Sequence, residues 1–196
     1  MTKGPQMLPR CVIAFTGAQG TGKSTLVKAI AGEVAARGLG QCTVYRGIGQ
    51  EAADQGIPLG GKADSTTIME FARLHVRRER GISGHGIHLL DRCFVDLLAY
   101  ARAKCHEQPS LVRLVEELAR SSLQGIDLVV RVPMIDSLRM NYSSHETSDF
   151  RSVIDESIDR IMSELQVGYL TVSGMPSERA GQVVSWINGF FGVQDK

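Results

Sequence analysis

The sequence is poor in several kinds of residue, and each shortage excludes a class of protein. Its 196 residues include 4 cysteines without C-x-x-C spacing, 6 prolines and 1 tryptophan. Few, unclustered cysteines argue against a disulfide-rich secreted domain and against a zinc site, and they indicate reduced thiols. No apolar run approaches the ~20 residues that cross a bilayer, and residues 1–10 lack the apolar stretch of a signal peptide. We therefore expect a cytoplasmic protein without a membrane partner, in the host cytoplasm if the source is a virus.

An excess of either charge is also missing. The 22 Lys and Arg residues nearly balance the 21 Asp and Glu residues, which leaves a formal net charge of +1. Any attraction to nucleic acid must then come from a local patch. The length and a hydrophobic content of 43% fit one α/β domain over residues 1–196 with a sizeable core. The composition is equally compatible with a monomer and a homodimer.

What the sequence does contain is a phosphate-binding loop. Residues 17–24 (GAQGTGKS) fit the pattern G-x-x-x-x-G-K-S/T, with an apolar run before them and a helical pattern after them. Backbone N–H groups and a helix N-terminus bind phosphates in such a loop, Lys23 reaches the β- and γ-phosphates, and the Ser24 hydroxyl binds Mg²⁺. We expect ATP and Mg²⁺ as ligands, and ATP contacts from Gly17, Ala18, Gln19, Gly20, Thr21, Gly22, Lys23, Ser24 and Thr25.

Strand-like and helix-like segments alternate along the rest of the chain. The predicted strands are 11–16, 41–45, 87–91, 127–132 and 168–172, and the predicted helices are 24–37, 66–80, 93–104, 110–122, 152–165 and 177–191. Ser65 and Ser177 are the predicted N-caps of two of these helices. The alternation predicts a doubly wound α/β fold, in which helices cover both faces of a five-stranded parallel sheet. Ligands bind such sheets at the carboxyl ends of the strands.

An acid and an arginine follow the third predicted strand. Asp91 is expected beside the phosphate-binding loop, where it can hold Mg²⁺ or accept a proton from an attacking hydroxyl. Arg92 can bind a phosphate with its planar guanidinium. The alternative is that Asp91 caps the next helix and Arg92 lies on the surface. A polar segment at about 140–151 is the predicted lid. Arg139 opens this segment and Arg151 ends it, and one or the other would join Lys23 in neutralising charge that develops during phosphoryl transfer.

These residues carry a resemblance to a known enzyme family. Residues 91–100 (DRCFVDLLAY) resemble the thymidylate kinase signature D-R-Y-x-x-S-x-x-A-Y-Q, with Cys93 and Asp96 in place of Tyr and Ser. Residues 71–76 (FARLHV) are similar to that family's F-A-x-x-R-x-x-H helix, and a more distant likeness is to nicotinamide riboside kinases. The resemblance implies a P-loop NTPase fold of the nucleotide-kinase type and an ATP-dependent phosphotransferase. The residues expected to bind its acceptor are Arg46, Phe71, Arg73, Arg77, Arg92 and Tyr100.

Two departures bear on the acceptor. The second predicted strand keeps Arg46 but lacks the acid of the thymidylate kinase motif R-E-P-G-G-T. Arg73, Arg77 and Arg80 are spaced to share one helix face, which is more positive charge than one phosphate needs. Such a stripe suits a DNA backbone, but it is equally typical of a solvated helix face paired with Glu70 and Glu79.

We therefore expect a thymine-like pyrimidine as the acceptor. Hydroxymethyluridine in phage DNA, flipped out of the helix, is placed first, because a phage-type hydroxymethyluridine DNA kinase resembles thymidylate kinases and would use the arginine stripe. Thymidylate, another nucleotide or a nucleoside such as nicotinamide riboside is the alternative within the kinases. A nucleotide-binding ATPase switch without an acceptor is the alternative from another class.

Overall fold

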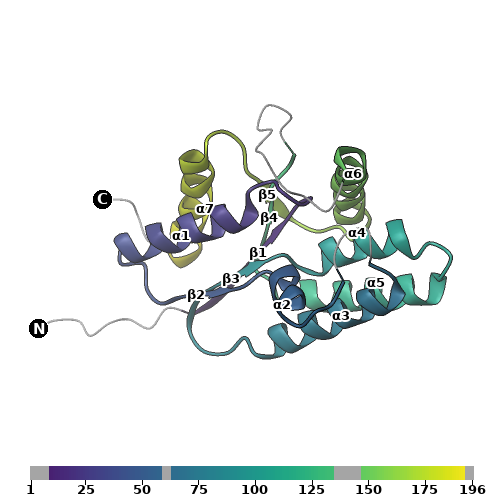
Figure 1. Cartoon of the computed structure of the whole chain (residues 1–196). Coiled ribbons are helices and arrows are strands. Elements are labelled where there is room, and N and C mark those ends of the chain that lie inside the picture. Colours follow the sequence, from purple (N-terminus) through teal and green to yellow (C-terminus); the bar gives the residue numbers. More distant parts are fainter. Residues whose placement is uncertain (1–8, 59–62, 135–146, 193–196) are drawn as a thin grey trace, which may run out of the picture.

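Strands and helices alternate along the chain in the computed structural model, which describes residues 9–58, 63–134 and 147–192 (Figure 1). The strands are β1 (Arg10–Thr16), β2 (Cys42–Tyr45), β3 (Gly86–Asp91), β4 (Leu128–Arg131) and β5 (Tyr169–Thr171). The helices are α1 (Lys23–Ala36), α2 (Ile48–Asp54), α3 (Ser65–Arg80), α4 (Phe94–Lys104), α5 (Pro109–Leu123), α6 (Ser148–Glu164) and α7 (Pro176–Phe191). Each predicted strand has a counterpart within two residues of its expected ends.

The five strands form one parallel sheet in the order β2-β3-β1-β4-β5. The central strand β1 pairs with both β3 and β4, so Phe15 lies opposite Asp91 and Thr16 lies opposite Arg131. From β1 the chain crosses to the edge strand β2 and returns to β3 beside β1, and it then crosses to the other side of β1 to form β4 and β5. The carboxyl end of β1 is therefore the switch point where such sheets bind ligands. The predicted doubly wound α/β fold is confirmed.

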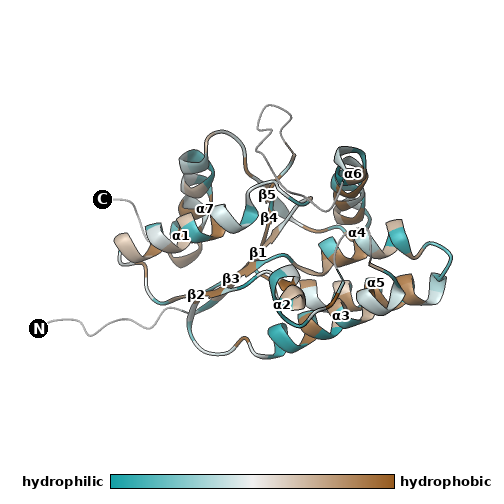
Figure 2. Cartoon of the chain, viewed as in Figure 1, coloured by the Kyte–Doolittle hydropathy of each residue, from teal (hydrophilic) through white to brown (hydrophobic). Residues whose placement is uncertain are grey.

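Helices cover both faces of the sheet, and two apolar cores result (Figure 1). Alternate residues of β1 enter different cores: Val12 and Ala14 face α3, α4, α5 and α6, whereas Ile13 and Phe15 face α1 and α7. All four side chains are fully buried, which explains why the middle of β1 is a continuous apolar run and does not alternate with polar residues (Figure 2). Burying a side chain of this size contributes ~1.5–3 kcal/mol relative to exposure.

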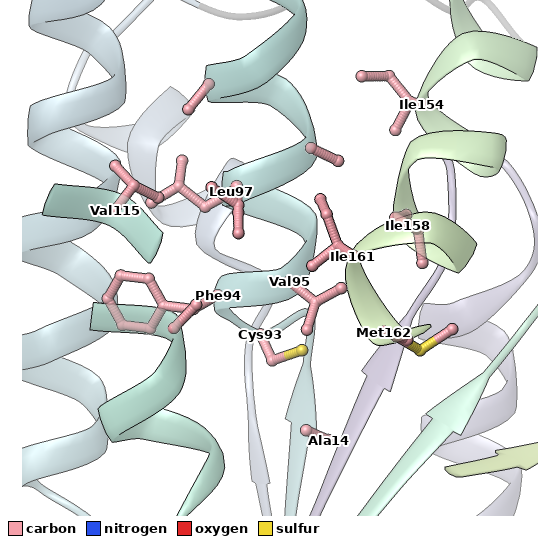
Figure 3. Packing of buried hydrophobic residues seen from close by; sticks show 14 of the residues in the cluster. Ala14, Cys93, Phe94, Val95, Leu97, Val115, Ile154, Ile158, Ile161 and Met162 are labelled. Carbon is pink, nitrogen blue, oxygen red and sulfur yellow. The ribbon is translucent and has the colours of Figure 1, made fainter. Parts of the chain in front are cut away.

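The core on the α4 side fixes the helix that carries several site residues. Figure 3 shows Val95 of α4 beside Ile158, Ile161 and Met162 of α6, whereas Leu97 points to the other side of α4, toward Val115. The same helix contacts α5, where Val115 is fully buried. Because α4 is held on both sides, its first turn presents polar groups to the carboxyl edge of the sheet in one fixed orientation.

Three local features differ from expectation. Asp64, rather than Ser65, caps α3 by accepting a 2.9 Å hydrogen bond from the Thr67 N–H. Helix α7 begins at Pro176 after Met175, one residue before the expected start. Proline is favoured at the first helical position, because the N–H group that it lacks would have no partner within the helix there. Helix α2 was not predicted, since the glycines around its first residue hide its apolar spacing; Ile48 and Ala52 are buried against Leu74.

The predicted lid is described only at its end. Residues 148–151 form the first turn of α6, capped by the Thr147 hydroxyl. Residues 135–146, including Arg139, lie outside the described residues. No helix in the described ranges is both long and apolar enough to span a bilayer.

Candidate functional site

The phosphate-binding loop connects β1 to α1. Gly17 has φ +153°, and a Cβ there would lie 2.3 Å from the Val132 carbonyl oxygen, so the turn requires glycine. Gly22 is the N-cap of α1 at φ +90°, and no side chain caps the helix. The N–H groups of the first turn are therefore left for a ligand, and the helix dipole favours an anion.

Lys23 is almost completely buried within this loop. Its Nζ donates 2.6 Å hydrogen bonds to the carbonyl oxygens of Gly17 and Ala18 and a 3.3 Å hydrogen bond to Thr21 Oγ1. Burial, and secondarily the charge of Arg92, lower the pKa of Lys23 from 10.5 to about 7. A phosphate group would stabilise the charged ammonium far better than carbonyl oxygens do.

Ser24 and Asp91 bring two oxygen ligands together beside the loop. The Ser24 hydroxyl donates a 2.5 Å hydrogen bond to Asp91 Oδ2. Gly47 passes so close that its Cβ would lie 3.2 Å from the same oxygen. In the part of the chain that is described, no group of three or more His, Cys, Asp or Glu side chains could hold a metal. Two protein oxygens completed by phosphate and water are the usual environment of Mg²⁺, so this pair fits that ion.

A cavity of about 470 Å³ opens from the loop toward α3 and α4. One end is lined by the loop and the start of α1, and the middle by Asp91, Arg92 and Asp96. The far end is mainly apolar and aromatic, with Ile68, Phe71, Leu97 and Tyr100 in its wall. The volume lies in the range of small-molecule sites, and the lining suits a flat organic ring next to a polyphosphate.

Arg92 occupies a strained backbone position in this cavity. Its φ is +75°, in the left-handed region, which costs a non-glycine residue ~1–3 kcal/mol. Two hydrogen bonds to its main chain hold it there: its N–H donates to the Phe15 carbonyl oxygen at 3.1 Å, and its carbonyl oxygen accepts from the Arg78 side-chain Nη2 at 2.7 Å. The side chain lies over the Tyr100 ring, with Cζ 5.9 Å from the ring centroid.

Asp96 connects Arg92 to the phosphate-binding loop. This carboxylate is 2% exposed and accepts from the Gly17 N–H at 3.3 Å and from Arg92 Nη1 at 3.2 Å. It also accepts from the Cys93 N–H at 3.2 Å at the start of α4. One buried side chain thus ties the loop, the strained arginine and a helix N-terminus together.

The predicted acceptor-binding residues separate into two groups. Phe71, Arg92 and Tyr100 line the cavity. Arg46 has a side chain 70% exposed and pairs with Asp54 at 3.4 Å, and Arg73 is 53% exposed and pairs with Glu70 at 2.8 Å. Neither arginine belongs to the described cavity wall.

Helix geometry explains why the arginine stripe is turned away. At 100° per residue, the cavity-lining positions of α3 span about a quarter of the helix circumference. These positions are Thr67, Ile68, Phe71 and His75. Arg73, Arg77 and Arg80 project from the opposite side of the helix, and all three are exposed. The expected contact between Arg73 and the acceptor would require its side chain to reach around α3.

Arg78, which the sequence places beside this stripe, points the other way. It is 8% exposed, and its guanidinium donates to the carbonyls of Asp91 at 3.2 Å and Arg92 at 2.7 Å. It also contacts His75 Nδ1 at 3.1 Å. Arg78 therefore supports the strained turn that carries Asp91 and Arg92.

A second buried cluster supports the loop from α6. Arg131, 2% exposed at the end of β4, pairs with Asp155 and Asp159 at 2.9 and 2.7 Å. Asp155 also accepts from the Ala18 N–H at 3.3 Å. Burial raises the pKa of Asp155, but hydrogen bonds and charge from Arg131 together hold it below its usual value. Arg151, a predicted catalytic residue, donates to the Gln19 carbonyl at 2.8 Å, so it lies at the loop.

Sequence reasoning missed the supporting residues, although some left a signal. Asp155 and Asp159 are four residues apart on a predicted helix, so they share a face that could meet an arginine at a strand end. Asp96 stands where the thymidylate kinase signature has serine. His75 and Arg78 are three residues apart, but nothing in the sequence shows that they face Asp91.

Solved structures resemble this chain at low sequence identity. The NadR protein in complex with NR matches with a TM-score of 0.72 and 16% identity, over 95% of this chain and 53% of that chain. NadR in complex with NAD and AMP-PNP matches with a TM-score of 0.67 and 17% identity, over 95% of this chain and 51% of that chain. Thymidylate kinase from Ehrlichia chaffeensis matches with a TM-score of 0.64 and 15% identity, over 91% of this chain and 99% of that chain. The chain spans about half the length of the NadR chains, and these identities show the fold alone.

The sequence comparisons give the family. None of the curated protein sequences matches the chain significantly. Residues 12–179, which include the loop, Asp91, Arg92 and Asp155, match the sequence pattern of a family described as AAA domain, AAA_28. The fold is that of a P-loop NTPase and resembles the folds of thymidylate kinase and NadR. The chain therefore belongs to this family of AAA domains.

Proposed function

We propose that this protein is an ATP-dependent kinase that transfers the γ-phosphate to a hydroxyl of a nucleoside-sized acceptor. The observation that carries the proposal is the placement of Asp91. Its carboxylate touches the Ser24 hydroxyl of the phosphate-binding loop and lines the cavity that extends toward Phe71 and Tyr100. A carboxylate between the phosphates and an organic pocket is where phosphoryl transfer to an acceptor needs one.

The proposed roles follow from the contacts. Backbone N–H groups of residues 17–25 and the Lys23 ammonium bind the phosphates, and Arg92 and Arg151 stabilise the charge on the transferred group. Mg²⁺, held by Ser24 and Asp91, would neutralise phosphate charge. The acceptor oxygen attacks the γ-phosphorus as the bond to ADP breaks. Asp91 takes the hydroxyl proton or holds the metal ion, and the proton then passes to solvent.

The charges in the cavity favour a hydroxyl acceptor over a monophosphate. Among the described lining residues, Lys23 and Arg92 are the cations, and Asp91 and Asp96 are the acids. Lys23 faces the ATP phosphates, and Arg92 is paired with Asp96. A second phosphate would bring two more negative charges next to the carboxylates. A neutral nucleoside such as thymidine, or a cationic one such as nicotinamide riboside, avoids that repulsion.

The DNA-linked acceptor placed first by the sequence loses its main argument. The arginine stripe lies on the side of α3 opposite the cavity, so a strand bound there would not lead its flipped base directly to Asp91. A thymine-like base remains compatible with the apolar wall at Phe71 and Leu97.

Transfer of labelled γ-phosphate tests the proposal. The chain is incubated with ATP and Mg²⁺ and with thymidine, thymidine monophosphate, nicotinamide riboside or DNA containing hydroxymethyluridine. We expect label on a nucleoside hydroxyl, and a loss of transfer in Asp91→Asn but not in Asp54→Asn, since Asp54 lies on the surface. Label on water alone would favour an ATPase switch. Label on DNA would restore the DNA acceptor. In that case a plot of the logarithm of DNA affinity against the logarithm of salt concentration should become shallower by about one unit in Arg77→Ala.

A further inference from the structure

His75 lies in the part of the cavity wall that is formed by α3. Its imidazole is 2% exposed and packs against the Phe94 ring at a centroid distance of 4.8 Å. The same face of α3 presents Ile68 and Phe71 to the cavity. Nothing in the proposed transfer of the phosphoryl group uses this ring, although a polar group in an apolar wall is costly unless it has a partner.

Arg78 decides which nitrogen of the ring carries the proton. Arg78 Nη2 lies 3.1 Å from His75 Nδ1. A guanidinium has donors only, so Nδ1 must accept, and the proton of the neutral ring then sits on Nε2. The same guanidinium is fixed by the carbonyls of Asp91 and Arg92. The direction of the ring and its tautomer are therefore set, through Arg78, by the main chain at Asp91 and Arg92.

The ring also stays neutral. Burial, with Arg78 and Arg92 as further causes, lowers the pKa of His75 well below 6.5. Near neutral pH the imidazole therefore offers one oriented donor, the Nε2–H, and no charge. A donor of this kind discriminates strongly, because a ligand without a matching acceptor atom leaves it unpaired.

We propose that His75 is a specificity-determining residue whose Nε2–H donates a hydrogen bond to an acceptor atom on the ring system of the second substrate. The inference rests on the proposed function, since it needs a second substrate in this cavity. The chemistry that it selects is a flat ring bearing a carbonyl or carboxamide oxygen or an unprotonated ring nitrogen. Rings with an apolar edge or only N–H groups at that position are rejected.

Nitrogen NMR of the whole chain tests the tautomer and the contact without any turnover. Histidine side chains are labelled with ¹⁵N, and the His75 signals are assigned by their loss in His75→Gln. We expect a protonated Nε2 and an unprotonated Nδ1, and a shift of the Nε2 signal when thymidine or nicotinamide riboside is added with Mg²⁺ and a non-hydrolysable ATP analogue. Protonation at Nδ1, or a signal that neither nucleoside moves, overturns the proposal.

Variants separate recognition from folding. His75→Leu removes the donor, and His75→Gln keeps an N–H at a similar place. For the nucleoside that wild type phosphorylates, His75→Leu should lower acceptor kcat/KM about ten-fold with the KM for ATP unchanged, and His75→Gln should recover most of it. His85→Leu, at an exposed histidine, is the matched control. Equal losses in His75→Leu and His75→Gln, or an equal rise in the KM for ATP, would contradict a specificity role.

The two proposals fail differently. A wild-type protein that transfers phosphate only to water contradicts the proposed kinase. In that case the NMR shift with the same nucleosides still decides whether His75 contacts them.

Discussion

The Asp96 carboxylate accepts hydrogen bonds from both the Gly17 N–H and the Arg92 guanidinium, so one buried side chain connects the phosphate-binding loop to the acceptor side of the cavity. The thymidylate kinase signature has serine at this position, and serine is too short and carries too little charge to hold both donors. Asp96 thus makes the position of Arg92 depend on the loop, and this dependence can be tested by substitution.

Asp96→Asn should weaken both folding and catalysis. The amide can accept on one side only, so at least one of the N–H groups of Gly17 and Cys93 loses its partner. We expect a loss of ~1–3 kcal/mol in unfolding free energy, measured by urea denaturation, and a lower acceptor kcat/KM. Asp54→Asn, which removes a charge at the surface, is the control. Wild-type stability in Asp96→Asn would show that these hydrogen bonds contribute nothing net.

Lys23→Met should remove turnover while leaving the protein folded. The substitution keeps the aliphatic stem and deletes a buried ammonium that carbonyl oxygens hold in the ligand-free chain. We expect ATP turnover to fall at least about a hundred-fold, as for other lost transition-state donors, with no loss in thermal stability. Lys28→Met on the exposed side of α1 is the control. Turnover at the wild-type rate would refute the assignment of the loop.

The stability of the ligand-free protein should depend on pH through Lys23. Burial lowers the pKa of Lys23 in the folded protein to about 7, whereas the ordinary value in the unfolded chain is 10.5, so between these pH values the unfolded chain binds the extra proton. Unfolding free energy therefore rises with pH in that window, by at most ~1.4 kcal/mol per pH unit. Cys11 and Cys93 have raised pKa values, which act in the opposite sense only above pH 9.

The difference between wild type and Lys23→Met isolates this contribution. Urea denaturation at several pH values from 7 to 9 should show the wild type gaining stability relative to the variant. Parallel profiles would mean that Lys23 titrates near its ordinary pKa in the folded protein.

Arg131→Leu should destabilise the protein by ~3–5 kcal/mol, because it leaves Asp155 partly buried without its counter-ion. Since Asp155 also holds the Ala18 N–H, ATP affinity should fall as well. Arg120→Leu removes an exposed pair with Glu116 and should change stability by less than ~1 kcal/mol. Calorimetry and ATP titration of both variants provide the measurement, and equal stability losses would contradict the structural role of Arg131.

The sequence by itself determined every strand and all the helices except α2, and it located the phosphate-binding loop. The glycines, Lys23 and Ser24 stand next to each other in the chain, and a loop of that pattern has one productive conformation between a strand and a helix. Asp91 followed from its place at the end of an apolar run. The doubly wound fold followed from alternation, because parallel strands need helical crossovers.

Only the tertiary structure decided which side chains meet across elements. Arg73 and Arg78 are five residues apart on one helix, yet Arg73 faces solvent and Arg78 faces the turn at Asp91, because the burial of Leu74 and Ala72 sets the rotation of α3. Asp96 and Gly17, which are in contact, are separated by 79 positions in the sequence, and Asp155 and Ala18 by 137 positions. Such contacts form only when the helices pack against the sheet, so a local sequence pattern does not predict them.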